Sequence, residues 1–362
     1  MNEANQREQA PRSGPLSAVP IHELITRWDL DKTYLRSRFD TLRELVTAAL
    51  EPPERKRSVP GAAAVLRELS SRGAWVHILS GSPRQMRRKL VAKLELDGVR
   101  WNELTLKPNL SNLLFLRFQA LRDQLGYKLP ELLKARVRDE RRLGSGMAPR
   151  EVLVGDDSES DAFVYSLYAD LCAGTVSASE LERVLRAGHA YEATLVACRR
   201  ALAQVPRVPV VDRILIHLDN QTPPSRFRPY GSRLVPFYNY LQAAFVLLER
   251  GVLSGAAVLR IAGEFLDQHG FSPDAVARSY LDLVRRGHAT GTVPSVLARA
   301  LEVLGSSALP VDALRRAVRQ LELDVPHVPT EPEERPPELD YAALASRYRG
   351  GRNRRRPGQR FF

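Results

Sequence analysis

Two aspartates separated by a single residue follow a short apolar run near the start of the chain. Asp29 and Asp31 come directly after residues 24–28, and the hydroxyl of Thr33 follows two positions later. Carboxylates grouped in this way can hold a divalent cation and act on a phosphate group. In that chemistry Asp29 attacks phosphorus to form an aspartyl-phosphate, and Asp31 protonates the leaving oxygen and then activates water. Aspartate is also a common turn and cap residue, so the pair needs partners elsewhere in the chain.

A hydroxyl group follows a second apolar run. Ser80 comes directly after residues 74–79, and Gly81 and Ser82 come next. The Ser80 hydroxyl and the amides of Gly81 and Ser82 can donate hydrogen bonds to the oxygens of a phosphoryl group. Taken alone, the segment is an ordinary turn, so its interpretation depends on its position after a strand.

More carboxylates follow a third apolar run, residues 151–154. Asp156 and Asp157 come after a glycine, and Asp161 lies a few residues further on. Acidic groups brought this close would repel one another without a cation, and oxygen ligands suit magnesium. We expect magnesium to be held by Asp29, by the backbone carbonyl of Leu30 or Asp31, and by Asp156, with Asp157 or Asp161 orienting the group.

A lysine is expected to supply positive charge to the phosphoryl oxygens, and two lysines compete for this role. We favour Lys128, which precedes the apolar segment 129–133 and lies upstream of the third apolar run. Lys107 follows the short apolar run 104–106 and can point at the same place. A lysine at the start of an amphipathic helix is more often solvated, so the choice stays open.

The segments that must position these residues alternate between short apolar runs typical of strands and apolar spacing typical of helices. The apolar runs at 24–28, 74–79, 104–106 and 151–154 predict strands, and the segments between them have helical spacing. Such alternation predicts an α/β fold, with a Rossmann-like parallel sheet and helices on both faces. Ligands bind such sheets at the carboxyl ends of the strands, which is where Asp29, Ser80 and Asp156 fall. The expected helices cover residues 36–50, 62–71, 84–94, 113–125 and 129–137.

The second half of the chain predicts helices without a chemical motif. Two helices are expected within residues 177–203, and a proline-rich joint follows at 205–209. Further helices are expected near residues 236–250, 254–269, 273–286, 293–304 and 311–321. We therefore divide the chain into a flexible N-terminus (1–20), a catalytic core (21–204), an all-helical accessory domain (205–324) and a disordered end (325–362) made of a Pro- and Glu-rich linker and an arginine-rich tail.

Composition narrows the class of protein. The 362 residues carry a formal charge of +12, which favours phosphorylated substrates, anionic lipid surfaces or nucleic acid. Seven of the arginines fall between Arg347 and Arg360. Two cysteines give neither a disulfide framework nor a metal-binding spacing, and no segment has the length and apolarity of a signal peptide or a transmembrane helix. We expect a cytoplasmic protein.

These groups, taken in chain order, resemble the four motifs of the haloacid dehalogenase superfamily of phosphohydrolases. Within it, residues 79–83 and 155–161 look most like the catalytic domain of the actin-patch-associated phosphatidate phosphatases. The resemblance covers residues 22–175 and implies a Rossmann-like core that binds magnesium. It implies these roles: nucleophile for Asp29, acid and base for Asp31, phosphoryl ligands for Ser80 and Lys128, and metal ligands for Asp156 and Asp157.

The chain departs from the phosphatidate phosphatase pattern at three places. Lys32 stands where that family has an acidic residue, and Arg84 stands where it has an aromatic one. A final strand after the acidic motif has no clear counterpart other than residues 165–172. These departures bear on the substrate more than on the superfamily.

The sequence as a whole predicts a magnesium-dependent phosphomonoester hydrolase that acts through an aspartyl-phosphate, with a phospholipid such as phosphatidate among its candidate substrates. The segment 34–60 is too short for a large cap over the site, so bulky substrates fit this prediction. Two alternatives stay open. One is a phosphatase-like binding module for nucleic acid or a protein partner, and the other is a phosphotransferase whose acceptor is not water.

Overall fold

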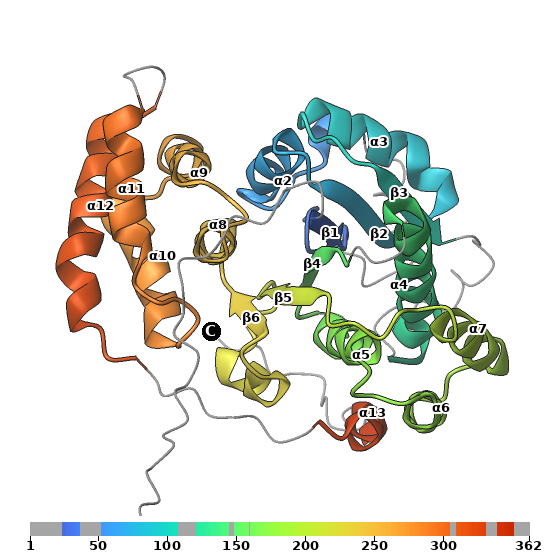
Figure 1. The fold of residues 1–362 in the computed structure, drawn as a ribbon. Coiled ribbons are helices and arrows are strands. Elements are labelled where there is room, and N and C mark those ends of the chain that lie inside the picture. Colours follow the sequence, from blue (N-terminus) through green and yellow to red (C-terminus); the bar gives the residue numbers. More distant parts are fainter. Residues whose placement is uncertain are drawn as a thin grey trace, which may run out of the picture.

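A six-stranded parallel sheet forms the centre of the molecule, in the order β3-β2-β1-β4-β5-β6 (Figure 1). The computed structural model describes residues 24–36, 52–107, 121–144, 148–158, 160–304, 309–330 and 339–350. The chain therefore has the α/β, Rossmann-like fold that the alternating pattern predicted. The strands are β1 (Leu24–Trp28), β2 (Trp75–Pro83), β3 (Glu103–Lys107), β4 (Arg150–Asp156), β5 (Val211–His217) and β6 (Leu234–Phe237).

Helices cover both faces of the sheet, and nearly all residues of the central strands β1, β2 and β4 are buried. One face packs against α2 (Ala62–Ser71), α3 (Arg87–Leu96) and α8 (Tyr240–Glu249), and the other packs against α4 (Leu121–Leu143) and α5 (Asp161–Ala173) (Figure 1). The remaining α-helices are α6 (Ala178–Ala187), α7 (Glu192–Leu202), α9 (Gly255–Gln268), α10 (Pro273–Arg285), α11 (Val293–Val303), α12 (Val311–Asp324) and α13 (Tyr341–Gly350), and the 3₁₀ helices are η2 (Pro53–Arg55), η3 (Arg84–Met86), η4 (Pro224–Tyr230) and η5 (Val325–His327). No helix in the described part of the chain is long and apolar enough to cross a membrane.

The register of the strands brings the predicted groups to one edge. Trp28, the last residue of β1, pairs with Ile78 on β2 and with Val154 on β4. Asp29, Ser80 and Asp156 therefore all lie at the carboxyl ends of three adjacent strands. Because β1 sits between β2 and β4, Asp29 is in the middle of this edge.

Two local elements differ from the expectation. The segment Ser80 to Pro83 was expected to be a turn, but it continues β2, with a shift of register against β3 between these two residues. Such a shift bends a strand and redirects its side chains. Lys128 was expected just before a helix, but it lies inside the long helix α4. The position inside a helix fixes the direction of its side chain more firmly than a helix start would.

The sheet also extends past residue 204, where the sequence analysis ended the catalytic core. β5 and β6 belong to the range that was expected to be all-helical, yet they complete the same sheet. The helix expected near residues 236–250 begins later, at Tyr240, because Asn239 caps α8 by accepting a hydrogen bond from the Gln242 amide at 3.1 Å. Residues 165–172, considered as the final strand, lie in α5, and β5 occupies the next place in the sheet.

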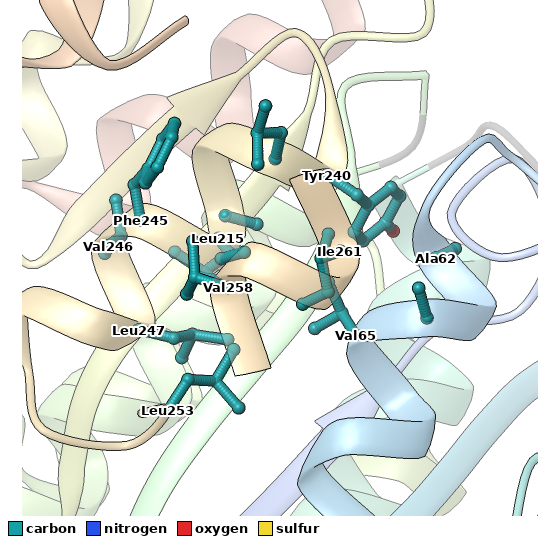
Figure 2. Close-up of a cluster of buried hydrophobic side chains, with 14 of the residues drawn as sticks. Ala62, Val65, Leu215, Tyr240, Phe245, Val246, Leu247, Leu253, Val258 and Ile261 are labelled. Carbon is teal, nitrogen blue, oxygen red and sulfur yellow. The ribbon is translucent and has the colours of Figure 1, made fainter. Parts of the chain in front are cut away.

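The C-terminal helices share a hydrophobic core with the sheet. Figure 2 shows side chains of α2, β5, α8 and α9 meeting in one buried cluster. Its labelled members include Val65, Leu215, Phe245 and Ile261, each 1% exposed or less. Burying one such side chain contributes roughly 1.5–3 kcal/mol to folding before entropy is counted. The helices beyond β6 are therefore continuous with the core that carries the sheet.

Among the described residues of the range 325–362, where disorder was expected, the short 3₁₀ helix η5 and the α-helix α13 form. α13 packs against α6, and the Tyr341 hydroxyl donates a hydrogen bond to Asp170 at 2.5 Å. The expected N-terminal segment 1–20, nearly all of the expected helix at 36–50 and arginine residues 352–360 lie outside the described residues.

Candidate active site

Three buried carboxylates meet at the carboxyl edge of the sheet. Asp29 follows β1, Asp156 ends β4 and Asp161 begins α5. Each offers one oxygen atom, and the three oxygens lie within 4.8 Å of one another. All three residues are at most 1% exposed. An all-oxygen set of this size fits a hard divalent cation such as magnesium.

A buried lysine contacts two of these carboxylates. The Lys128 ammonium lies 3.0 Å from Asp29 Oδ1 and 2.5 Å from Asp161 Oδ1. We call Asp29, Lys128, Asp156 and Asp161 the Asp29 cluster. Its three carboxylates and one ammonium carry a formal charge of −2 when all are ionised. That surplus of negative charge in a buried place favours the binding of a divalent cation.

The competing lysine lies elsewhere on the edge. Lys107 ends β3, where it pairs with Pro83, and β3 is separated from β1 by β2. Of the two lysines left open by the sequence, the structure thus brings Lys128 into contact with Asp29.

Gly155 makes room for Asp161. A Cβ atom on residue 155 would lie only 2.3 Å from Asp161 Oδ2 and 2.7 Å from its Cβ. The same oxygen accepts a hydrogen bond from the Asp156 amide at 3.3 Å. The absence of a side chain at Gly155 therefore lets the start of α5 approach the end of β4 and places Asp161 in the cluster.

Thr33 connects the two strands of the cluster. Its hydroxyl lies 3.4 Å from Asp29 Oδ2 and 3.4 Å from Asp156 Oδ2. The other Asp156 oxygen accepts a hydrogen bond from the Ser158 amide at 2.5 Å. These contacts orient the two carboxylates before any ligand binds.

Asp31 is held on the opposite side of Asp29, towards β2. Its Oδ2 accepts hydrogen bonds from the Ser80 hydroxyl at 3.1 Å and the Ser82 hydroxyl at 2.8 Å. The Asp31 carboxylate is not one of the three carboxylates that lie within 4.8 Å of one another. The sequence analysis expected Asp31 to contact the metal through its backbone carbonyl, with the Leu30 carbonyl as the alternative. Beside these serines, a Cβ on Gly81 would meet no described heavy atom within 4 Å.

Asp157 lies apart from the three carboxylates. Its two oxygens accept hydrogen bonds from the amides of Asn220 and Thr222, at 2.8 and 2.9 Å. Asp157, which was expected to bind the metal, thus supports the loop after β5. Asp161 is the third carboxylate of the group, beside Asp29 and Asp156. The reason is the pleat of the strand end, which sends consecutive side chains in opposite directions.

The sequence analysis missed three residues that surround the cluster. The Tyr240 hydroxyl donates to the Thr33 carbonyl at 2.7 Å, and burial, followed by the charges of Asp156 and Asp29, raises the pKa of this phenol. His217 pairs with Asp156 across the sheet, and burial lowers its pKa. The short apolar run 214–216 followed by a polar residue was the available signal for His217, since a similar pattern marked the other strand ends.

Tyr127 is the third missed residue, and it precedes Lys128 on α4. Among the described residues its hydroxyl has no hydrogen-bond partner, although the oxygen atom is buried. Burial, followed by Glu131, raises its pKa, and Lys128 and Asp29 are close enough to influence it. A phenol in this state is a donor that a ligand at the cluster can use.

Comparisons of the chain with protein-family models, with curated proteins and with solved structures gave no match. The site's interpretation therefore depends on its own geometry.

Proposed function

We propose that this protein is a magnesium-dependent phosphomonoester hydrolase that forms a covalent phosphoryl intermediate on Asp29. The observation that carries the proposal is the Asp29 cluster itself. It joins a buried candidate nucleophile, an ammonium 3.0 Å from that nucleophile and two further carboxylates at the carboxyl edge of a parallel sheet.

In the first step, a carboxylate oxygen of Asp29 attacks phosphorus. The new bond joins this oxygen to phosphorus, and the bond between phosphorus and the leaving oxygen breaks. The leaving oxygen keeps the electron pair and takes a proton from Asp31. The Ser80 and Ser82 hydroxyls, which contact Asp31, hold this acid beside Asp29.

In the second step, water attacks the phosphorus of the aspartyl-phosphate. Asp31, now deprotonated, takes the proton from water, and the bond between phosphorus and Asp29 breaks. Inorganic phosphate leaves, and both carboxylates return to their first state. The two half-reactions balance without any further reactant.

Positive charge is needed because an anionic phosphate approaches an anionic carboxylate. Lys128 supplies one charge directly to Asp29. A magnesium ion held by Asp29, Asp156 and Asp161 would supply the rest by offsetting the charge of the phosphoryl oxygens. The Ser80 hydroxyl beside Asp31 and the buried Tyr127 hydroxyl, one residue before Lys128, are hydrogen-bond donors that the phosphoryl oxygens could use.

The test is turnover of p-nitrophenyl phosphate by the full chain, with magnesium and with a chelator. We expect metal-dependent turnover that falls by roughly 10³-fold or more in Asp29→Asn and by a smaller factor in Asp31→Asn. The matched control is Asp312→Asn on α12, whose carboxylate is exposed. Turnover that survives Asp29→Asn would disprove the covalent mechanism. Absence of turnover on a panel that includes phosphatidate would favour the binding-module alternative.

A further inference from the structure

A large cavity lies beside the Asp29 cluster, on the side of β5. Its volume is about 1210 Å³. One wall comes from the loop after β1 and includes Lys32, which stands between Asp31 and Thr33. Another comes from the end of β5 and includes His217, the register partner of Asp156. The cavity and the cluster therefore share the same two strand ends.

The outer wall of this cavity comes from the C-terminal helical region. Tyr238 and Phe271 line it, together with the buried ring of Phe265 on α9. The Phe265 ring packs so closely on Gly61 that a Cβ there would lie 2.4 Å from it. This close packing holds the start of α2 against α9. The helices without a chemical motif thus border the site.

The backbone that lines the cavity is strained. Lys32 and Gln221 have φ angles of 60° and 54°, in the left-handed region that side chains disfavour. Non-glycine residues in this region cost on the order of 1 kcal/mol or more each and gather at ligand-binding places. Asp157 holds the second of these loops through the amides of Asn220 and Thr222.

The cavity is lined by cationic, aromatic and acidic side chains. Lys32 and Arg36 are cationic, and the rings of Tyr238 and Phe271 offer flat apolar surface. Asp219 offers a carboxylate that can accept hydrogen bonds from hydroxyl groups. A phosphoryl group alone needs far less room, since pockets for whole ligands measure roughly 300–1,000 Å³.

We propose that this cavity binds the leaving group of the substrate, and that this group carries a planar ring and a second anionic group, as in a nucleoside bisphosphate. The inference rests on the proposed phosphatase function. In this arrangement one phosphate lies at Asp29, the second contacts Arg36 and Lys32, and the ring lies against Phe271 and Tyr238. The C-terminal helical region then determines which phosphomonoester is used.

Steady-state kinetics with three substrates tests the proposal. Adenosine 3′,5′-bisphosphate has both features, fructose 1,6-bisphosphate lacks the aromatic ring, and p-nitrophenyl phosphate lacks the second anion. For Arg36→Gln we expect kcat/KM to fall about tenfold for both bisphosphates and less than about threefold for p-nitrophenyl phosphate, because a charge-assisted hydrogen bond is lost. The matched control is Arg88→Gln, an exposed arginine on α3 outside the cavity.

The ring is tested by a second variant. Phe271→Ala should lower kcat/KM about tenfold for adenosine 3′,5′-bisphosphate and leave fructose 1,6-bisphosphate within about twofold, because only the first has a planar ring to pack on the wall. Val303→Ala, an exposed residue on α11, is the control. Equal losses for all three substrates in either variant would overturn the assignment of the cavity to the leaving group.

A binding measurement separates this proposal from the proposed function. Calorimetry on the Asp29→Asn protein should show tighter binding of adenosine 3′,5′-bisphosphate than of inorganic phosphate, weakened about tenfold by adding Arg36→Gln. If no phosphomonoester is turned over but this binding holds, the phosphatase function fails and the cavity stands. If turnover occurs but the bisphosphate binds no tighter than inorganic phosphate, the cavity fails and the phosphatase function stands.

Discussion

Two buried groups of charged side chains lie along the same side of the sheet. The first is the Asp29 cluster, and the second, one layer further from the carboxyl edge, is centred on Arg27. Both use β1, where Arg27 and Asp29 are two residues apart, and both use α4 and α5. The two groups thus share the same supporting elements, and they differ in their balance of charge.

In the Arg27 cluster, which consists of Arg27, Asp139, Arg142 and Glu151, each charge has an opposite neighbour. The Arg27 guanidinium donates to both Glu151 oxygens at 2.8 and 2.9 Å and to Asp139 at 2.7 Å. Arg142 donates to the other Asp139 oxygen at 3.1 Å. Two guanidinium groups and two carboxylates are formally neutral. Arg27, Asp139 and Glu151 are buried and Arg142 reaches Asp139 from an exposed position, so the group is balanced without a metal ion.

The Asp29 cluster has three carboxylates to one ammonium and lies at the strand ends. The comparison teaches that burial of charge does not by itself mark a binding site. The Asp29 cluster is a candidate binding site because it has a surplus of negative charge and lies at the edge where ligands reach a parallel sheet. Changes to the two clusters should therefore have opposite consequences.

The largest expected effect is in the neutral cluster. Glu151→Gln leaves Arg27 without its bidentate partner in a fully buried place, which should lower the free energy of unfolding by about 3–5 kcal/mol. Urea denaturation followed by circular dichroism measures this loss. Glu95→Gln, exposed on α3, is the control. A Glu151→Gln protein as stable as the parent would remove the distinction between the two clusters.

Magnesium should act on the other cluster. At 100 times its dissociation constant, a ligand that binds only the folded chain stabilises it by about 2.7 kcal/mol. We expect that gain in the parent chain and its loss in Asp156→Asn. Without metal, Asp156→Asn should be at least as stable as the parent, because one of three like charges is gone.

The adjacent residue is the control for that experiment. Asp157→Asn should keep the magnesium response, because the Asp157 carboxylate binds loop amides and lies outside the three. A magnesium response lost in Asp157→Asn and kept in Asp156→Asn would reverse the assignment of the two residues.

The part of this site that the sequence predicts is the set of strand ends. Asp29, Ser80 and Asp156 each follow an apolar run, and parallel strands must bring such positions to one edge. The choice among neighbouring carboxylates was not predictable in the same way. Asp157 and Asp161 look alike in the sequence, and only the pleat of β4 and the missing side chain at Gly155 decide which one faces Asp29.

The end of the sheet was missed for related physical reasons. In β5 the charged pair Asp212 and Arg213 directly follows the first residue, which hides the buried half of the strand. β6 has four residues and contains Pro236, which an edge strand accepts but which weakens any strand signal. Both strands form by pairing with a neighbouring strand of the sheet. The periodicity of a short segment gives no information about such a neighbour.

A smaller effect is expected from crowding the Asp29 cluster without changing its charge. Gly155→Ala places a Cβ 2.3 Å from Asp161 Oδ2, so Asp161 must move. We expect a loss of about 1–3 kcal/mol in unfolding free energy, typical of overpacking, and a weaker magnesium response. Gly81→Ala is the matched control, because its Cβ would meet no described heavy atom within 4 Å. If both variants respond alike to magnesium, the position of Asp161 is not what forms the site.

The smallest effect concerns the pH dependence of the Arg27 cluster. Its neighbour His77 is fully buried, and its Nδ1 lies 3.1 Å from an Arg27 nitrogen. Since arginine only donates, Nδ1 accepts and Nε2 carries the proton, 3.0 Å from the Thr105 hydroxyl. Burial, followed by the positive charges of Arg27 and Arg138, holds the pKa of His77 well below its usual value.

The sign of the pH effect follows from that lowered pKa. As pH falls through about 6.5, His77 takes up a proton in the unfolded chain but stays neutral in the folded chain. The contribution of His77 to stability is therefore complete above this pH. Below it, the free energy of unfolding falls by about 1.4 kcal/mol per pH unit. His77→Gln should flatten the dependence of the unfolding free energy on pH between about pH 6.5 and 5, where this linkage acts. The control is His327→Gln, on the exposed 3₁₀ helix η5. Because burial also lowers the pKa of His217 and His288, the difference between parent and variant isolates His77. An unchanged slope in His77→Gln would mean that His77 is protonated beside Arg27, and the second cluster would then carry a surplus of positive charge instead of being neutral.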